Sequence, residues 1–182
     1  MVPLYEWRWA KRTLPTAESK ASKPNGETVT HTMAKLSFPQ FLGPSRDCKI
    51  PGPSLATDWS AEPPEKLWRQ PIGAAWSGFA VAAHRAVTQE QRDENEAVVC
   101  YNVQTGSVLW LHTDSGQYKT ALAGEGPRAT PTIHNERVYT LGATGVLNCL
   151  ELATGKPVWK RHIAIDAGLD LDAPVDQSGL TS

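Results

Sequence analysis

Short runs of alternating apolar and polar residues fill the central part of the chain. In residues 137–159, RVYTLGATGVLNCLELATGKPVW, the apolar residues Val138, Leu150 and Leu152 alternate in part with polar ones, and glycines separate the runs. Alternation with a period of two is typical of half-buried strands, and glycine between such runs is typical of tight turns. The pattern therefore predicts short strands joined by hairpins.

The strongest feature is an internal repeat with an offset of 49 residues. Residues 100–110, CYNVQTGSVLW, align without a gap with residues 149–159, CLELATGKPVW. A partial copy lies earlier, where LWRQPI around Trp68 resembles VWKRHI around Trp159. The residues of the structural repeat motif are Asn102, Thr105, Gly106, Trp110, Thr154, Gly155, Trp159 and Trp68. Self-similarity at this spacing indicates a repeat architecture.

Each full copy places Thr-Gly between two strands and a tryptophan four residues after the glycine. Glycine adopts the positive φ of a tight hairpin without strain, and the threonine hydroxyl bonds nearby backbone. The tryptophan falls in the last strand of its unit, where a large ring fills the wedge between neighbouring sheets. We interpret the tryptophans as packing residues.

Four short antiparallel strands that recur about every 40 to 50 residues predict a β-propeller blade. We therefore expect an all-β fold, a partial β-propeller of four-stranded antiparallel blades with two full blades plus flanking strands. The blades are placed at about 76–113 and 128–163. Residues 66–72 are expected to form the lone last strand of an incomplete third blade.

The chain divides into three parts of different composition. Residues 1–35 carry six Lys and Arg against three Asp and Glu and are rich in Lys, Ser, Thr and Pro, which is typical of a disordered basic tail. Residues 36–65 read as an irregular segment, and residues 66–182 hold the repeats. Met33 is an alternative start to Met1, in which case the tail arises upstream of the natural start codon.

Composition narrows the function classes only slightly. The chain is 40% hydrophobic and 20% charged, with a formal net charge of -1, so no global charge attracts nucleic acid or an anionic membrane. We expect neither a nucleic-acid partner nor a membrane span, and no signal peptide is visible. Three cysteines without a CxxC pair leave the redox compartment open.

The residue types that most often carry chemistry favour structural interpretations here. Cys100 and Cys149 occupy equivalent positions in successive units, too far apart for a disulfide, so we expect buried, small apolar residues. The five histidines show no zinc-site spacing, and surface or strand-end positions are expected for them. We assign no catalytic, cofactor-binding or metal-binding residue.

Two polar segments invite functional interpretations that we do not favour. The charged run QEQRDENE, residues 89–96, lacks the spacing and the glycine of an EF-hand, so we expect a solvated hairpin tip rather than a cation site. A cation site in this run would use Glu90, Asp93, Glu94 and Glu96 as its ligands. AGEGPRATP, residues 123–131, does not connect a strand to a helix as a phosphate-binding loop does, and we expect an interblade loop.

The eleven-residue unit resembles the tryptophan-docking repeat of the PQQ-like (pyrrolo-quinoline quinone) β-propellers, A-x-[DN]-x-x-T-G-x-x-x-W. Cys100 and Cys149 stand where that pattern has alanine, and Glu151 stands where it has Asp or Asn. The stretch FPQFLGPSRDCKIPG, residues 38–52, is similar to the segment W-P-x-F-R-G-P-x-R-D-G that precedes the repeats in this family. The resemblance covers residues 38–182.

That resemblance implies two kinds of function. The superfamily includes quinoprotein alcohol dehydrogenases, which bind PQQ and calcium on the propeller axis, and non-catalytic scaffolds such as the outer-membrane assembly factor BamB. The adjacent cysteine pair of the dehydrogenases is missing here, and no Asp matches their catalytic base. A fold analogy alone does not confer the chemistry.

We therefore expect a non-catalytic binding or assembly scaffold that is a truncated part of a larger ring, with no cofactor of its own. The alternative is the N-terminal part of a PQQ- and calcium-dependent alcohol or polyvinyl alcohol dehydrogenase. A further alternative is that the short chain assembles several copies into a ring. A protein partner is expected, the exposed edge strands favour self-association, and the resemblance implies the periplasm or cell envelope.

Overall fold

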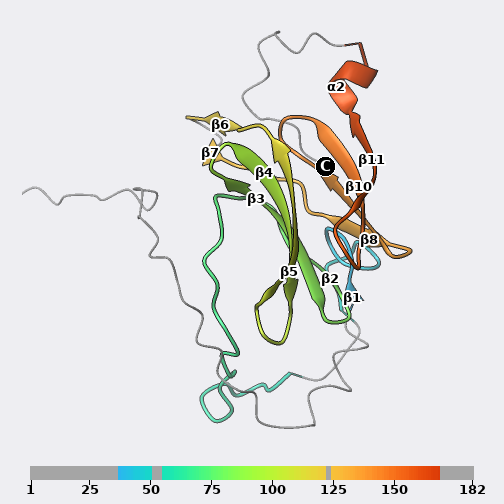
Figure 1. The fold of residues 1–182 in the computed structure, drawn as a ribbon. Helices are drawn as coiled ribbons and strands as arrows, with labels where there is room; N and C mark the ends of the chain where they lie inside the picture. Colours follow the sequence, from blue (N-terminus) through green and yellow to red (C-terminus); the bar gives the residue numbers. More distant parts are fainter. Residues whose placement is uncertain (1–36, 51–54, 122–123, 169–182) are drawn as a thin grey trace, which may run out of the picture.

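The computed structural model describes residues 37–50, 55–121 and 124–168. The predicted basic tail, residues 1–35, lies outside the described residues. Within them the chain forms two larger antiparallel β-sheets and one two-stranded hairpin, so the predicted fold class, an all-β partial propeller, is confirmed (Figure 1). The first sheet has five strands instead of the predicted four, because β1 (Ser37–Phe38) pairs with the edge of the four-stranded unit.

The first sheet, called blade 1 below, has the strand order β1-β2-β3-β4-β5. Its strands are β1 (Ser37–Phe38), β2 (Ala80–Ala82), β3 (Arg85–Arg92), β4 (Asn95–Asn102) and β5 (Val108–Ser115). The second sheet, blade 2, has the order β11-β10-β9-β8. Its strands are β8 (Thr132–His134), β9 (Arg137–Leu141), β10 (Val146–Glu151) and β11 (Pro157–His162). In sequence, the hairpin of β6 (Lys119–Thr120) and β7 (Gly124–Glu125) separates the two blades, and the helix α2 (Ile163–Asp166) follows β11.

The sequence repeat is also a repeat of strand register. Cys100 lies opposite Trp110 in blade 1, and Cys149 lies opposite Trp159 in blade 2. In both blades the register shifts directly after the cysteine, before the Thr-Gly hairpin. Gly106 has a φ of 69° and its equivalent in blade 2 has a φ of 70°, so both hairpins need the left-handed conformation that glycine adopts without strain.

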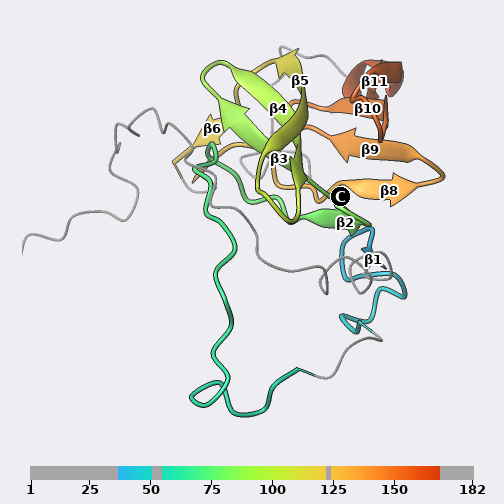
Figure 2. The same cartoon turned by 60° about the horizontal axis from the view of Figure 1, so that its bottom comes forward.

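The main core lies between the two blades. β2 and β8 lie side by side, and the facing surfaces of the sheets meet along the molecule (Figure 2). Alternate residues of β3, β4 and β9 point into this layer, as expected from the period of two. The buried apolar cluster consists of Ala80, Val87, Val98, Cys100, Trp110, Ile133, Val138, Leu150 and Leu152. Cys100 and Cys149 are both buried and unbonded, as the sequence predicted.

The strand predicted over residues 66–72 does not form. A strand needs a partner for its backbone hydrogen bonds, and among the described residues none pairs with this segment. It runs along blade 1 as an extended connection instead. The indole of Trp68 anchors it by donating a hydrogen bond to the carbonyl of Val103 at 2.7 Å.

The prediction of a solvated tip for residues 89–96 is also wrong. Strands β3 and β4 continue through this run, and only residues 93–95, at the turn, are exposed. Glu90 and Glu96 are buried although both are acidic. They are tolerated because each finds specific donors: Arg92 and the backbone N–H of Gly73 donate to Glu90.

Candidate functional site

The repeat tryptophans lie between consecutive units rather than within one unit. Trp110 of β5 reaches blade 2, where its indole N–H donates to the carbonyl of Leu152 at 2.9 Å and its ring covers Gly155. Trp68 makes the same contact one unit earlier, with Val103 and Gly106. Each tryptophan therefore docks on the Thr-Gly hairpin of the following blade.

The remaining motif residues shape these hairpins. The carboxamide oxygen of Asn102 accepts hydrogen bonds from the backbone N–H groups of Gln104 and Thr105. In blade 2 the hydroxyl of Thr154 donates to Glu151 at 2.8 Å. Glu151, which departs from the family pattern, thus still bonds within the hairpin, although it binds a side chain rather than the backbone.

Trp159 stands apart from the other two tryptophans. Its side chain is 41% exposed, against 8% for Trp110. It lies on the face of blade 2 that is turned away from blade 1, with its ring 6.1 Å from that of Tyr139. The structure therefore brings Trp68 and Trp110 into docking contacts, and among the described residues it gives Trp159 no contact of this kind.

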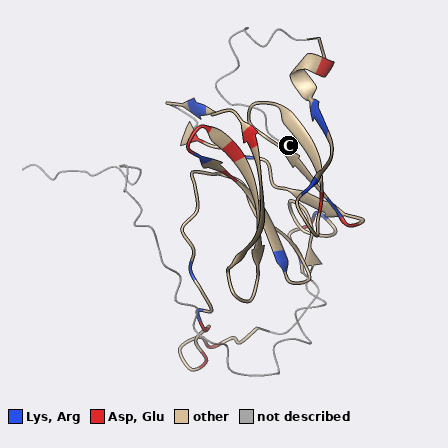
Figure 3. Cartoon of the chain, viewed as in Figure 1, with Lys and Arg blue, Asp and Glu red and all other residues tan. Residues whose placement is uncertain are grey.

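A polar seam joins the blades at the end where the β3–β4 hairpin lies. Figure 3 shows acidic residues gathered at this end of blade 1. The carboxylate of Glu96 crosses to blade 2 and accepts hydrogen bonds from the N–H of Ala143 and the hydroxyl of Thr144, each at 2.8 Å. Sequence analysis missed this contact, because nothing in a charged run tells which carboxylates turn inward.

Glu96 permits a direct stability test. Replacing Glu96 by alanine leaves the buried N–H of Ala143 without its partner, so we expect the free energy of unfolding to fall by about 1–3 kcal/mol. The matched change Glu94→Ala, at an exposed position of the same hairpin, should shift it by less than about 0.5 kcal/mol. Urea denaturation measures both, and equal losses for the two variants would contradict the seam.

Asp114 is the second carboxylate of the seam. It accepts hydrogen bonds from Asn148 at 2.5 Å and Lys160 at 2.6 Å, both in blade 2. His112 lies 3.4 Å away, without the alignment of a hydrogen bond. Burial by itself raises the pKa of Asp114, but the interactions with His112, Lys160 and Asn148 outweigh it and hold the pKa well below its ordinary range.

The lowered pKa of Asp114 predicts a loss of stability in acid. A carboxyl group whose pKa is lower in the folded state stabilises the fold above its unfolded pKa and loses that contribution as the pH falls toward the folded pKa. We expect the thermal midpoint to fall below about pH 4, and to fall less steeply in Asp114→Asn. Melting curves along a pH series test this. Parallel curves for the two proteins would show that Asp114 does not carry the effect.

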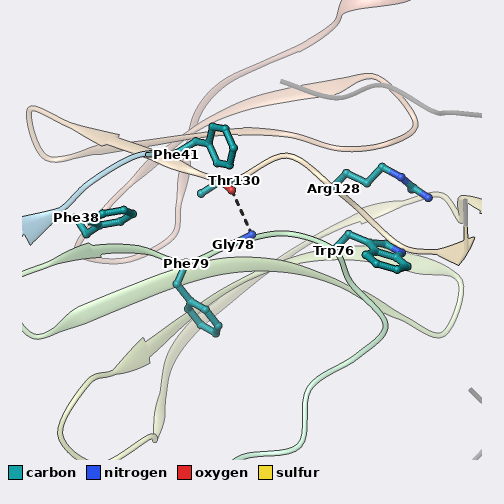
Figure 4. A pocket seen from close by; sticks show the side chains of 7 residues that line it. All are labelled: Phe38, Phe41, Trp76, Gly78, Phe79, Arg128 and Thr130. Carbon is teal, nitrogen blue, oxygen red and sulfur yellow. Dashed lines mark hydrogen bonds between the residues drawn. The ribbon is translucent and has the colours of Figure 1, made fainter. Parts of the chain in front are cut away.

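A pocket of about 350 Å³ opens where the inner strands of the two blades meet. Figure 4 shows Phe38 and Phe41 at one end and Trp76 and Arg128 at the other, with the hydrogen bond from the N–H of Gly78 to the Thr130 hydroxyl between them. The lining residues are Phe38, Phe41, Trp76, Gly78, Phe79, Arg128 and Thr130. We call this the inner pocket.

The inner pocket combines exposed aromatic surface with a fixed cation. Phe41 and Trp76 are 60% and 57% exposed. The guanidinium of Arg128 donates to the carbonyl of Gly126 and lies 4.9 Å from the ring centre of Tyr118, which holds it in place. Arg128 and Thr130 belong to the segment predicted as an interblade loop. Its sequence gave no signal of the pocket, because the aromatic residues come from distant segments.

A calcium site of the kind that the resemblance implies is not matched by the described residues. Within residues 37–50, 55–121 and 124–168, no three His, Cys, Asp or Glu side chains group closely enough to hold a metal ion. No helix in the described part has the length and apolar character needed to cross a membrane.

Comparison with known protein families supports the repeat architecture that the sequence predicts. The sequence profile of the family described as outer membrane protein assembly factor BamB matches residues 56–169. The chain belongs to this family, whose members are built from PQQ-like repeats. No curated protein matches the chain.

Three solved structures illustrate the similarity. BamB from Moraxella catarrhalis is 18% identical with a TM-score of 0.36, and the match covers 47% of this chain and 23% of that one. Quinohemoprotein alcohol dehydrogenase from Comamonas testosteroni is 17% identical with a TM-score of 0.42, covering 58% and 15%. A europium-containing methanol dehydrogenase is 15% identical with a TM-score of 0.40, covering 50% and 16%. The match thus spans less than a quarter of each of these proteins.

Proposed function

We propose that this chain is part of a β-propeller that serves as a non-catalytic scaffold for binding another protein. Membership of a family described as an assembly factor supports the proposal. The observation that carries it is the inner pocket, which exposed Phe41 and Trp76 line together with Arg128. Aromatic residues and arginine are the types most enriched at the energetic centres of protein interfaces.

The composition of the inner pocket suggests what it would bind. Its aromatic side chains offer apolar contact area, whereas Arg128 offers a positive charge held by backbone and by Tyr118. A partner segment with an apolar side chain next to a carboxylate would match both. The family description supports a partner in the cell envelope, and we propose that location for the chain.

Photo-crosslinking in envelope preparations tests the scaffold proposal. A photoreactive amino acid is placed at position 76 and, as the matched control, at position 59, because Trp76 and Trp59 are exposed to nearly the same extent, 57% and 59%. We expect position 76 to give one discrete protein adduct that is absent from position 59. The same adducts from both positions, or none from position 76, would contradict the role of the inner pocket.

The alternative, that the chain is the N-terminal part of a PQQ- and calcium-dependent alcohol dehydrogenase, requires a different test. Purified protein is supplied with PQQ and Ca²⁺, and dye-linked oxidation of short alcohols is followed. We expect no turnover above that of the free cofactor. Turnover that depends on the protein would replace the scaffold proposal by the enzyme.

A further inference from the structure

Polar side chains from both blades meet in the middle of the polar seam. On blade 2, Thr140, Asn148 and Lys160 lie opposite one another on β9, β10 and β11, so they share one face of the sheet. That face is turned toward blade 1, because Asn148 and Lys160 both donate to Asp114 of β5. His112 belongs to the same strand as Asp114, and its Nε2 atom lies 3.4 Å from that carboxylate. The seam therefore brings together polar groups from neighbouring strands of both blades.

Three atoms of this group have no hydrogen-bond partner among the described residues. They are the hydroxyl oxygen of Thr140, the carboxamide oxygen of Asn148 and Nε2 of His112. Thr140 and Asn148 are 1% and 2% exposed, and the side chain of His112 is 15% exposed, so bulk solvent does not reach these atoms. Buried polar atoms are nearly always hydrogen-bonded, because leaving them unbonded costs free energy. The three atoms therefore call for a ligand.

Other buried polar side chains between and within the blades are satisfied by the chain itself. The carboxamide of Gln89 donates to the carbonyl of Ala129 at 2.6 Å. The hydroxyl of Thr88, which is also 1% exposed, donates to the carbonyl of Gly78 at 3.1 Å. Burial of a threonine in these sheets thus does not by itself leave the hydroxyl without a partner. The unbonded group is confined to the middle of the seam.

The chemistry of the three atoms suits a water molecule. The carboxamide oxygen of Asn148 only accepts, the hydroxyl of Thr140 donates and accepts, and Nε2 of His112 does either according to its tautomer. A water can donate to the first and bond to the other two, and buried waters typically make about three hydrogen bonds to such groups. A metal ion suits the position less well. Lys160 places a positive charge 2.6 Å from Asp114, and the described residues hold no metal-binding group of His, Cys, Asp or Glu.

We propose that an ordered water molecule is bound in the seam between the blades, where it bridges Thr140, Asn148 and His112. The interface is then dry where Trp110 docks and hydrated at the seam. A bridging water of this kind contributes to a contact much as a direct hydrogen bond does. The proposal does not depend on the scaffold role or on the inner pocket, so either can fail without the other.

The sign of the stability change in Thr140→Val tests the proposal. Valine matches the shape of threonine and suits strands at least as well, so loss of a hydroxyl that binds nothing leaves the protein as stable or more stable. Loss of a bridge to water should instead raise the equilibrium constant for unfolding, by roughly three- to tenfold.

Thr88→Val is the matched control, because its hydroxyl has a protein acceptor and its loss should raise the constant in any case. Urea denaturation measures both variants. A constant for Thr140→Val equal to or below that of the wild type, beside a raised constant for Thr88→Val, would overturn the proposal.

Oxygen-17 relaxation dispersion of the solvent then detects the bound water itself. It follows the oxygen of water, so exchange of hydroxyl or imidazole protons does not imitate the signal. We expect the folded wild type to hold long-lived water, Thr140→Val to hold about one molecule fewer, and Thr88→Val to match the wild type. Equal dispersion amplitudes for the wild type and Thr140→Val would overturn the proposal even if their stabilities differed.

Discussion

Replacing Trp110 by alanine is expected to lower the free energy of unfolding by about 3–5 kcal/mol. The side chain is buried between the blades and its indole donates to the carbonyl of Leu152. Its removal leaves a cavity over Gly155 and a buried carbonyl without its donor. Because the blades share this contact, we also expect their unfolding to become less cooperative.

Trp159→Ala is the matched control for that experiment. Trp159 holds the same repeat position but is 41% exposed, and the single chain gives its indole no hydrogen bond among the described residues. A loss of about 1 kcal/mol or less is expected. Chemical denaturation followed by tryptophan fluorescence and by circular dichroism measures both variants. Equal losses would mean that docking between blades does not stabilise the fold.

The second large effect is expected at Gly155. A Cβ atom built there lies 2.5 Å from Cε3 of Trp110, and the residue has a φ of +70°. Gly155→Ala therefore adds left-handed backbone strain to a collision with a buried ring. We expect a loss of about 2–4 kcal/mol, the sum of a backbone cost of about 1 kcal/mol and an overpacking cost of about 1–3 kcal/mol.

Gly168→Ala separates these two contributions. Gly168 has the same φ of +70°, but no atom of the described residues lies within 4 Å of the Cβ that alanine would add. Its substitution should cost only the backbone term of about 1 kcal/mol. The difference between the variants, measured by thermal and urea denaturation, isolates the contact with Trp110. If Gly168→Ala lowered the free energy of unfolding as much as Gly155→Ala, the collision with Trp110 would not contribute to the loss.

The fold was predictable because its determinants are local and repeated. The 49-residue offset aligns Cys100 with Cys149 and Trp110 with Trp159, and the strands keep that alignment down to the register shift after each cysteine. Thr-Gly hairpins are specified by the few residues that tolerate positive φ. The assignment of the tryptophans to packing, which rested on the repeat, agrees with the contacts of Trp68 and Trp110.

The polar seam and the inner pocket were not predictable, because both depend on residues that are far apart in the sequence. Whether Glu96 is solvated or buried depends on donors 47 and 48 residues away, which composition does not reveal. The inner pocket joins Phe38 and Trp76 to Arg128, from three separate segments. The prediction of a strand over residues 66–72 was wrong because a strand needs a partner strand, and the sequence of the segment itself does not show whether a partner is present.

The central claim is that the tryptophan of one unit docks on the glycine of the next. A nuclear Overhauser measurement between the indole protons of Trp110 and the α-protons of Gly155 tests it most directly. The short approach of the ring to this glycine predicts strong cross-peaks and α-proton signals shifted upfield by the ring current. The indole N–H, bonded to Leu152, should exchange slowly with solvent. Absence of these cross-peaks in the folded protein, with random-coil shifts at Gly155, would contradict docking between the blades.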